Sequence, residues 1–290
     1  MEKPDIEKIR PLIKLAIEED LGRGDVTTSL FFKDDTSAKA DIVSRREIIV
    51  CGMDVAAEVF RCYNENLKLK VIVNDGAPAG GNDKIAEIEG PLRSMLSAER
   101  VALNFLQRLS GIATTTHKFV QTVAGTEAKI YDTRKTTPGL RLLEKYAVRC
   151  GGGRNHRLGL YDAVLIKDNH LAQFGENLYS KLSNAVAEAK KLKDINFIAV
   201  EVDNIDEQLE DVLKIAGIDI VLLDNMEPGQ LKRAVEMRNA ICGKGQKPLL
   251  EASGKITLDN VLDIAACGID RIAVGAITHS APAVDIGLDR

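Results

Sequence analysis

A strand, a helix and a second strand can be read from residues 197–225, FIAVEVDNIDEQLEDVLKIAGIDIVLLDN. The two apolar runs, 197–204 and 219–225, each end in polar residues, and the segment between them has the spacing of an amphipathic helix. A strand, a helix and a strand in succession predict two parallel strands joined by a right-handed crossover. Because the runs are almost continuously apolar, we expect helices on both faces of the sheet.

The same rhythm extends over the second half of the chain. Six apolar runs have this form: KIYDTRK (129–135), AVLIKDN (163–169), FIAVEVDN (197–204), DIVLLDN (219–225), PLLEASG (248–254) and RIAVGAI (271–277). Helical patterns lie between them, at 180–191, 205–216 and 258–267. The repeat favours an incomplete β/α barrel, with an open doubly wound sheet as the structural alternative.

The first half of the chain has a different organisation. An amphipathic helix over residues 6–21 ends at Gly22, and short β-type runs at 38–42, 47–50, 67–73 and 84–89 follow it. A long helix then begins at Ser97, which we interpret as its N-cap. This half is therefore expected to be an α/β domain with an antiparallel sheet.

Composition excludes several classes of protein. The chain has 290 residues and a net charge of −4, with no basic tail, so a general nucleic-acid binder is not expected. No apolar run is long enough to cross a bilayer, and the charged N-terminus does not resemble a signal peptide. Five scattered cysteines, none in a CxxC motif, indicate reduced thiols and a cytoplasmic location.

Positive charge is concentrated between Arg134 and His170. This segment contains eight Lys or Arg residues and only three acidic residues, in a chain that is acidic as a whole. Such a cluster attracts a small anion that carries several charges. Arg141, Lys145 and Arg149 recur every four residues of a predicted helix, and we expect at least two of them to form a solvated face.

The expected carboxyl ends of the strands carry a sorted set of polar residues. Ligand chemistry in α/β barrels collects at these ends. In chain order they are Thr133, Arg134 and Lys135, then Lys167, Glu201, Asp224, Ser253 with Gly254, and Gly275. The cations suit carboxylates and the acids suit sugar hydroxyls, whereas the glycine turns suit a phosphate. Surface ion pairs and simple tight turns are the alternative interpretations.

Two assignments stay open at this point. Asp203 is as available as Glu201 by sequence alone. Among the histidines, His156 and His279 are better candidates than His117 or His170, because they lie in the motif segments. No HExxH, clustered Cys/His or GxSxG motif is present, so zinc and serine hydrolases have no support.

Taken together, these segments resemble the quinolinate phosphoribosyltransferase family. The resemblance is carried by EDLGRGDVTT (19–28), SAERVALNFLQRLSGIAT (97–114), DTRKTTPGLR (132–141), GGGRNHRLGLYDAVLIKDNH (151–170), EVDN, LLDNM, EASGKI and GAITHSAPAVDIGLD. It covers almost the whole chain. DTRKTTPGLR and the segment 151–170 are highly specific, whereas the short late motifs are weak singly.

The resemblance implies a fold and a reaction. The fold is an N-terminal α/β sandwich domain (1–112, with the tail 280–290 as a candidate to return to it) and a seven-stranded, open, TIM-like β/α barrel (113–279). The reaction joins quinolinate to 5-phosphoribosyl-1-pyrophosphate (PRPP), giving nicotinate mononucleotide, pyrophosphate and carbon dioxide. The chain would thus be a pentosyltransferase of NAD biosynthesis. Magnesium would accompany PRPP near Glu201 and Asp224, with no metal bound directly by the protein and no organic cofactor.

The resemblance also implies roles for individual residues. The expected quinolinate-binding residues are Arg100, Thr133, Arg134, Lys135, His156, Arg157 and Lys167. The expected PRPP-binding residues are Lys135, Glu201, Asp224, Ser253, Gly254, Lys255, Gly275, Ala276 and His279. Lys135, Lys167, Glu201 and Asp224 would be catalytic. Arg100 would reach into the site of the other subunit of a homodimer, which itself could belong to a higher oligomer.

Three other functions are weighed against this one. A phosphoribosyltransferase for nicotinate or another mono-acid ring would use similar residues. A Schiff-base aldolase could use Lys167 as its nucleophile. A non-catalytic paralogue could bind an anion for transport or regulation. The presence of Arg134, Lys135, Lys167, Glu201 and Asp224 argues against lost chemistry.

Overall fold

The computed structural model describes residues 3–32, 36–171, 177–243, 245 and 247–289. They form two compact units, each built from more than one segment of the chain. The first unit contains residues 1–117, 136–152 and 277–290, and the second contains 118–135 and 153–276. In the described part of the chain, no helix is long and apolar enough to span a membrane.

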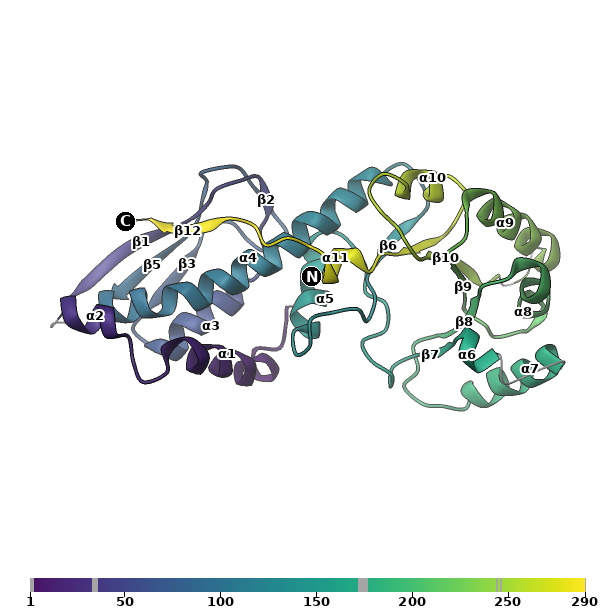
Figure 1. Cartoon of the computed structure of the whole chain (residues 1–290), viewed down its shortest axis with the longest axis horizontal. Coiled ribbons are helices and arrows are strands. Elements are labelled where there is room, and N and C mark those ends of the chain that lie inside the picture. The colour runs from purple at the N-terminus through teal and green to yellow at the C-terminus, as the bar shows by residue number, and fades with distance from the viewer. Residues whose placement is uncertain (1–2, 33–35, 172–176, 244, 246, 290) are drawn as a thin grey trace. The chain divides into compact units, whose positions relative to one another are not determined.

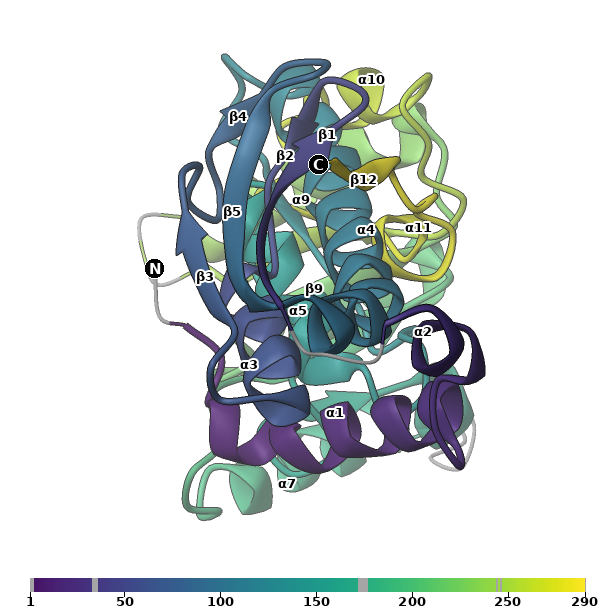
Figure 2. The ribbon, with the colours of Figure 1, turned by 90° about the vertical axis from the view of Figure 1, so that its left-hand side faces the viewer.

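An antiparallel sheet with the order β12-β1-β5-β3 forms the centre of the first unit. Its strands are β1 (Ser37–Ser44), β3 (Lys68–Val71), β5 (Lys84–Pro91) and β12 (Ile286–Asp289), and β2 (Ile48–Ile49) pairs separately with β4 (Pro78–Ala79). The last strand of the chain therefore pairs with the first, with Ile42 opposite Leu288. α3 (Met53–Tyr63) packs against both α1 (Ile6–Leu21) and β3 (Figure 2).

The long helix α4 (Leu92–Thr122) begins five residues before the predicted start. Ser97 is therefore not an N-cap, and its hydroxyl instead donates a hydrogen bond to Asp25 at 2.9 Å. Asp25 is itself the N-cap of α2 (Val26–Phe31) and accepts the backbone N–H of Thr28. The local Ser-x-Glu pattern indicated a cap, but Leu92 and Met95 are buried, and that burial extends the helix backwards.

The predicted solvated face of α5 (Arg141–Cys150) is wrong. Lys145 is only 2% exposed, and Arg141 and Arg149 are half-buried. Glu144 on the same helix is fully buried and accepts hydrogen bonds from Arg108 and from Thr137. The spacing of the charged residues on α5 is that of a solvent-exposed helix, but its Lys and Arg side chains are buried or half-buried in the first unit.

The second unit is built on six parallel strands, one for each predicted apolar run (Figure 1). They are β6 (Lys129–Tyr131), β7 (Val164–Ile166), β8 (Ile198–Val202), β9 (Ile220–Asp224), β10 (Leu249–Ser253) and β11 (Arg271–Ala273), in the order β6-β11-β10-β9-β8-β7. Consecutive strands from β7 to β11 are neighbours, and β6 pairs with β11. This order lacks the central reversal that defines a doubly wound sheet, so that alternative is excluded.

The helices that connect the strands of this unit lie outside the sheet, where α7 packs against α8, α8 against α9 and α9 against α10 (Figure 1). The helical elements of the unit are α6 (Asp168–Leu171), α7 (Leu178–Ala189), the π-helical turn η2 (Ile205–Leu209), α8 (Glu210–Lys214), α9 (Pro228–Cys242) and α10 (Val261–Ala265). The short helix α11 (Ala276–His279) begins in this unit and continues in the first. The helix predicted at 205–216 is present as η2 followed by α8. α10 is shorter than the predicted 258–267, because turns precede and follow it.

Candidate active site

A cavity of about 540 Å³ lies at the carboxyl ends of the parallel strands. The residues that line it all belong to the second unit. Those named from the sequence are Thr133, Arg134, Lys135, His156, Arg157, Lys167, Glu201, Asp224, Ser253, Gly254 and Lys255. The five that sequence reasoning missed are Leu165, Leu222, Asn225, Glu251 and Ala273.

Strand alternation explains why these residues share one cavity. Side chains two positions apart on a strand lie on the same face of the sheet. Leu222 and Asp224 alternate in this way on β9, and Glu251 and Ser253 do so on β10. The register places Ser253 beside Asp224, and Glu251 beside Leu222. Four of the five missed residues lie two positions before a residue named at a strand end, and Asn225 directly follows one.

Arginine and lysine side chains gather at one part of the cavity wall. Arg157 is buried, and its pKa is lowered by that burial and by the neighbouring positive charge of Arg134. Asp162 and Glu201 act in the opposite direction. Two guanidinium groups that repel each other in a half-enclosed space favour an anion that can neutralise both.

Asp132 joins the two most specific sequence motifs. It follows β6 and is fully buried. Its carboxylate accepts the backbone N–H of His156 at 2.7 Å and the side-chain amide of Asn155 at 2.7 Å. The segment that carries His156 and Arg157 is therefore held against the end of β6, close to Thr133 and Arg134.

Glu201 and Asp224 provide the carboxylates of the cavity. Glu201 lies at the end of β8, where its Oε2 is 3.3 Å from the Nζ of Lys167. Burial raises the pKa of Glu201, and Lys167 offsets this effect only in part, while Asp224 and Asp168 add to it. The site thus holds a partly desolvated acid that favours a developing positive charge or a hydroxyl donor nearby.

A tight turn follows β10 at Gly254 and Lys255. Both residues have positive φ, 94° and 52°. A Cβ on Gly254 would lie 2.2 Å from the Oδ1 of Asn225, so only glycine fits. The backbone N–H of Asn225 also donates to the carbonyl of Ser253 at 2.8 Å. This turn brings backbone groups and a hydroxyl to the rim of the cavity.

Four of the predicted residues do not line this cavity. Arg100 is exposed on α4 and His279 is exposed at the end of α11, and both belong to the first unit. Gly275 and Ala276 belong to the second unit, at the start of α11, but they are not among the lining residues. Their assigned roles stay predictions.

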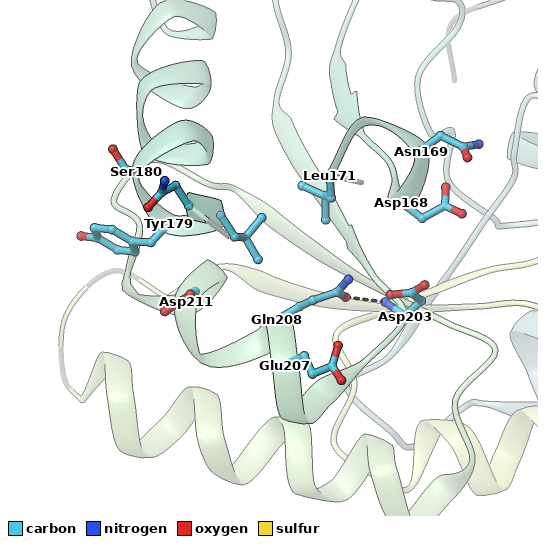
Figure 3. A pocket seen from close by; sticks show the side chains of 11 residues that line it. Asp168, Asn169, Leu171, Tyr179, Ser180, Asp203, Glu207, Gln208 and Asp211 are labelled. Atoms are coloured by element: carbon cyan, nitrogen blue, oxygen red, sulfur yellow. Dashed lines mark hydrogen bonds between the residues drawn. The ribbon is translucent and has the colours of Figure 1, made fainter. Parts of the chain in front are cut away.

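Asp203 lies in a different hollow (Figure 3). This second hollow, of about 790 Å³, is lined by Asp168, Asp203, Glu207 and Asp211 among others. The backbone N–H of Asp203 donates to the side-chain oxygen of Gln208 at 3.0 Å, and the Asp203 residue is exposed. Glu201 thus lines the cationic cavity, whereas Asp203 lines the other hollow, and their functional roles stay predictions.

Comparisons with known proteins cover nearly the whole chain. Residues 25–110 match the family model of the quinolinate phosphoribosyl transferase N-terminal domain, and residues 112–289 match that of its C-terminal domain. A probable nicotinate-nucleotide pyrophosphorylase (carboxylating) of Bacillus subtilis is 39% identical over 97% of this chain and 93% of its own length. The corresponding enzyme of Mycobacterium leprae is 41% identical over 98% of both chains.

A solved structure agrees with these sequence matches. The nicotinate-nucleotide pyrophosphorylase from Francisella tularensis superposes with a TM-score of 0.89 at 40% identity, covering 99% of this chain and 97% of the other. Both family models, the full-length relatives and this solved structure therefore point to the same family. The chain belongs to the quinolinate phosphoribosyltransferase family.

Proposed function

We propose that this protein transfers the phosphoribosyl group of PRPP to quinolinate and releases pyrophosphate and carbon dioxide, so that nicotinate mononucleotide is formed. The observation that carries the proposal is the composition of one cavity. Arg134, Arg157 and Lys167 face the same space as Glu201 and Asp224. A diacid and a phosphorylated sugar need both kinds of charge within a few ångströms of each other.

The arrangement suggests a separate role in substrate binding or catalysis for each group of residues. Arg134 and Arg157 would hold the two carboxylates of quinolinate and so orient the pyridine nitrogen toward the sugar. Glu201 and Asp224 would accept the ribose hydroxyls and stabilise the positive charge that develops at C1 as pyrophosphate leaves. Ser253 and the turn at Gly254 would hold the 5′-phosphate through hydroxyl and backbone donors. Lys135 would lie between the two substrates.

Positioning and fixed charge then account for the chemistry without a covalent intermediate. Once the ring nitrogen is bonded to ribose it is cationic. The neighbouring carboxylate then leaves as carbon dioxide, and its bonding electron pair stays on the ring carbon, where the adjacent positive charge stabilises it until the carbon takes up a proton from water. Lys167 is ill suited to the alternative aldolase role, since its side chain is 46% exposed and ion-paired with Glu201. A Schiff-base lysine needs a desolvated amine.

Magnesium fits the carboxylates of this cavity. Mg²⁺ prefers oxygen ligands and commonly uses one or two carboxylates together with substrate phosphates. Glu201 and Asp224 supply such oxygens, whereas Cys51, Asp75 and Cys150 form the one three-residue metal-ligand group among the described residues, in the first unit. We propose that the ion arrives with PRPP, is held near Glu201 and Asp224, and neutralises pyrophosphate charge.

We further propose that the six-stranded sheet is part of a seven-stranded open barrel. Arg154 forms an isolated parallel bridge with Tyr131, and the backbone N–H of Arg154 donates to Ile130 at 2.8 Å. This short segment supplies a neighbour on the free edge of β6. This placement supports a barrel that is open between residue 154 and β7.

The functional unit that we propose is a cytoplasmic homodimer with shared sites. The support is that Arg100, which the family resemblance assigns to the partner's site, is exposed on α4. Val26, Leu30 and Phe31 on α2 are also more than 70% exposed. An apolar helix face of this kind is typical of a surface that is covered in an assembly.

The direct test is to incubate the purified protein with quinolinate, PRPP and magnesium and to separate the products by chromatography. We expect nicotinate mononucleotide to form from quinolinate and not from nicotinate. Formation of the product from nicotinate alone would select the mono-acid enzyme instead. No product from either acid would contradict the proposed activity.

A further inference from the structure

Three polar side chains are buried together beneath the cavity. His156, Glu251 and Arg271 are each at most 9% exposed. Glu251 on β10 and Arg271 on β11 are register partners, and the Arg271 Nε donates to the Glu251 Oε2 at 2.5 Å. The Arg271 guanidinium also lies 3.7 Å from the centre of the Tyr131 ring. Buried charges need such partners, because an unpaired charge in a protein interior is costly.

The ring of His156 is held between two groups. Its Nδ1 lies 2.8 Å from the backbone nitrogen of Arg157. A backbone N–H can only donate, so Nδ1 carries no proton and the ring is neutral with its proton on Nε2. That Nε2 lies 3.1 Å from the Glu251 Oε1.

We propose that Glu251 is a positioning residue that holds His156 as its neutral Nε2–H tautomer, through which His156 fixes the backbone of Arg157 at the quinolinate end of the cavity. The inference rests on the proposed function for its purpose, although its geometry does not. A protonated His156 would have to give up the Arg157 N–H bond. His156 therefore acts as a structural link between Glu251 and the backbone of Arg157.

The charged groups around the ring all fit this assignment. The Glu251 Oε1 lies beside Nε2, and Arg271 forms an ion pair with the other carboxylate oxygen of Glu251. Arg157 contributes its backbone N–H, and Asp132 accepts the N–H of His156 itself. The edge of the ring also packs against Phe197, with ring centres 5.1 Å apart.

The substitution Glu251→Gln distinguishes a positioning role of Glu251 from a role in packing alone. In Glu251→Gln, the Arg271 Nε–H still points at the side chain and can only donate, so the new amide must turn its oxygen toward Arg271. Its NH₂ group then faces Nε2 of His156, which also carries a proton. The clash of two donors drives the imidazole toward its other tautomer and breaks the link to Arg157.

A second substitution should repair the first. In the double variant Glu251→Gln/Arg271→Met, no donor opposes the amide, so it can rotate and present its oxygen to His156. We expect the quinolinate KM to rise about tenfold in the single variant and to return toward the wild-type value in the double variant. The PRPP KM should change less than about twofold in both.

A matched control uses a buried acid in the other unit. Glu58 is 6% exposed and accepts hydrogen bonds from Arg10 and Arg61. Glu58→Gln should leave both KM values unchanged, because Glu58 does not touch the cavity. A double variant that is no better than Glu251→Gln would overturn the positioning role, since a merely structural ion pair predicts further loss.

The tautomer can be measured without any substrate. The chain has four histidines, so ¹⁵N-histidine NMR with a His156→Asn variant assigns the signal of His156. We expect the ¹⁵N shifts of the neutral Nε2–H tautomer near neutral pH. A proton on Nδ1 would overturn the inference. Absence of quinolinate turnover in the wild type, with the NMR result intact, would instead reject the proposed function.

Discussion

At the scale of single residues, some charged side chains of the cavity have unfavourable surroundings that a bound substrate can improve. Glu201 is the clearest case, because its burial outweighs its contact with Lys167 and raises its pKa. The folded protein therefore binds a proton on Glu201 more readily than the unfolded chain does. The stability that the protonated carboxyl contributes is present at low pH and is lost as the pH rises from the ordinary glutamate range through the raised value.

Glu201→Gln should separate activity from stability. The amide removes the desolvated charge, so we expect the melting temperature at pH 7 to rise by about 1–3 °C. Turnover should fall on the order of 10²-fold, because the ribose and the developing positive charge lose their acceptor. Calorimetry at pH 7 and pH 4.5 checks the sign, since the difference should shrink at the lower pH. A lower melting temperature at pH 7 would contradict this account.

Arg157 is expected to be the main determinant for the diacid. It is buried beside Arg134 and lines the cavity. Arg157→Ala should lower kcat/KM for quinolinate on the order of 10²-fold or more, and Arg157→Lys should lower it less. Steady-state kinetics with PRPP saturating measures this effect. Near-normal kinetics in Arg157→Ala would remove Arg157 from the site.

At the scale of helices and strands, buried contacts determine helix bounds and buried faces that local sequence patterns do not predict. The strands could be predicted from the sequence because parallel, covered strands are apolar runs with polar ends. The start of α4 and the buried face of α5 could not, since both depend on partners far along the chain. Arg108 shows this, as it donates to Glu144 and also to the carbonyls of Thr278 and Ala281.

Glu144 should therefore matter for stability although it is not part of the cavity. Its carboxylate is fully buried, 2.7 Å from the Nη2 of Arg108. Glu144→Ala leaves that guanidinium without its counter-charge, and we expect a loss of about 3 kcal/mol in unfolding free energy. Urea denaturation followed by circular dichroism measures it. Glu188→Ala, at an exposed pair with Lys191, is the control and should leave the midpoint unchanged. An equally small loss in both variants would count against α5 as a buried element.

At the scale of the whole molecule, the proposed homodimer can be tested. Arg100 does not line the cavity of the second unit. If Arg100 belongs to the partner's site, as the resemblance implies, the dimer would itself be part of the active site. This assignment can be tested by mixing inactive variants.

Mixing Arg100→Ala protein with Lys167→Ala protein should restore activity. In a mixed dimer, one of the two sites receives an intact Arg100 and an intact Lys167. With free subunit exchange, half of the dimers are mixed, so recovery should approach about a quarter of the wild-type rate. Exchange is verified by native mass spectrometry of differently tagged subunits. No recovery despite proven exchange would reject the shared site.

Site residues at the ends of the strands could be predicted from the sequence better than residues further back in the strands. Lys167, Glu201, Asp224 and Ser253 could be named because each lies at or next to the end of an apolar run. Glu251 was missed because it lies two residues further back, and its pairing with Arg271 depends on the neighbouring strand. Asp203 and Glu201 could not be separated until the backbone placed them in different hollows.

The central claim is electrostatic: guanidinium groups in one cavity select a diacid over a mono-acid. Isothermal titration calorimetry of the wild-type protein with quinolinate and with nicotinate tests this claim directly. We predict that quinolinate binds at least about tenfold more tightly at low salt, and that the difference narrows as ionic strength rises. Equal affinities for the two acids, unaffected by salt, would contradict the account.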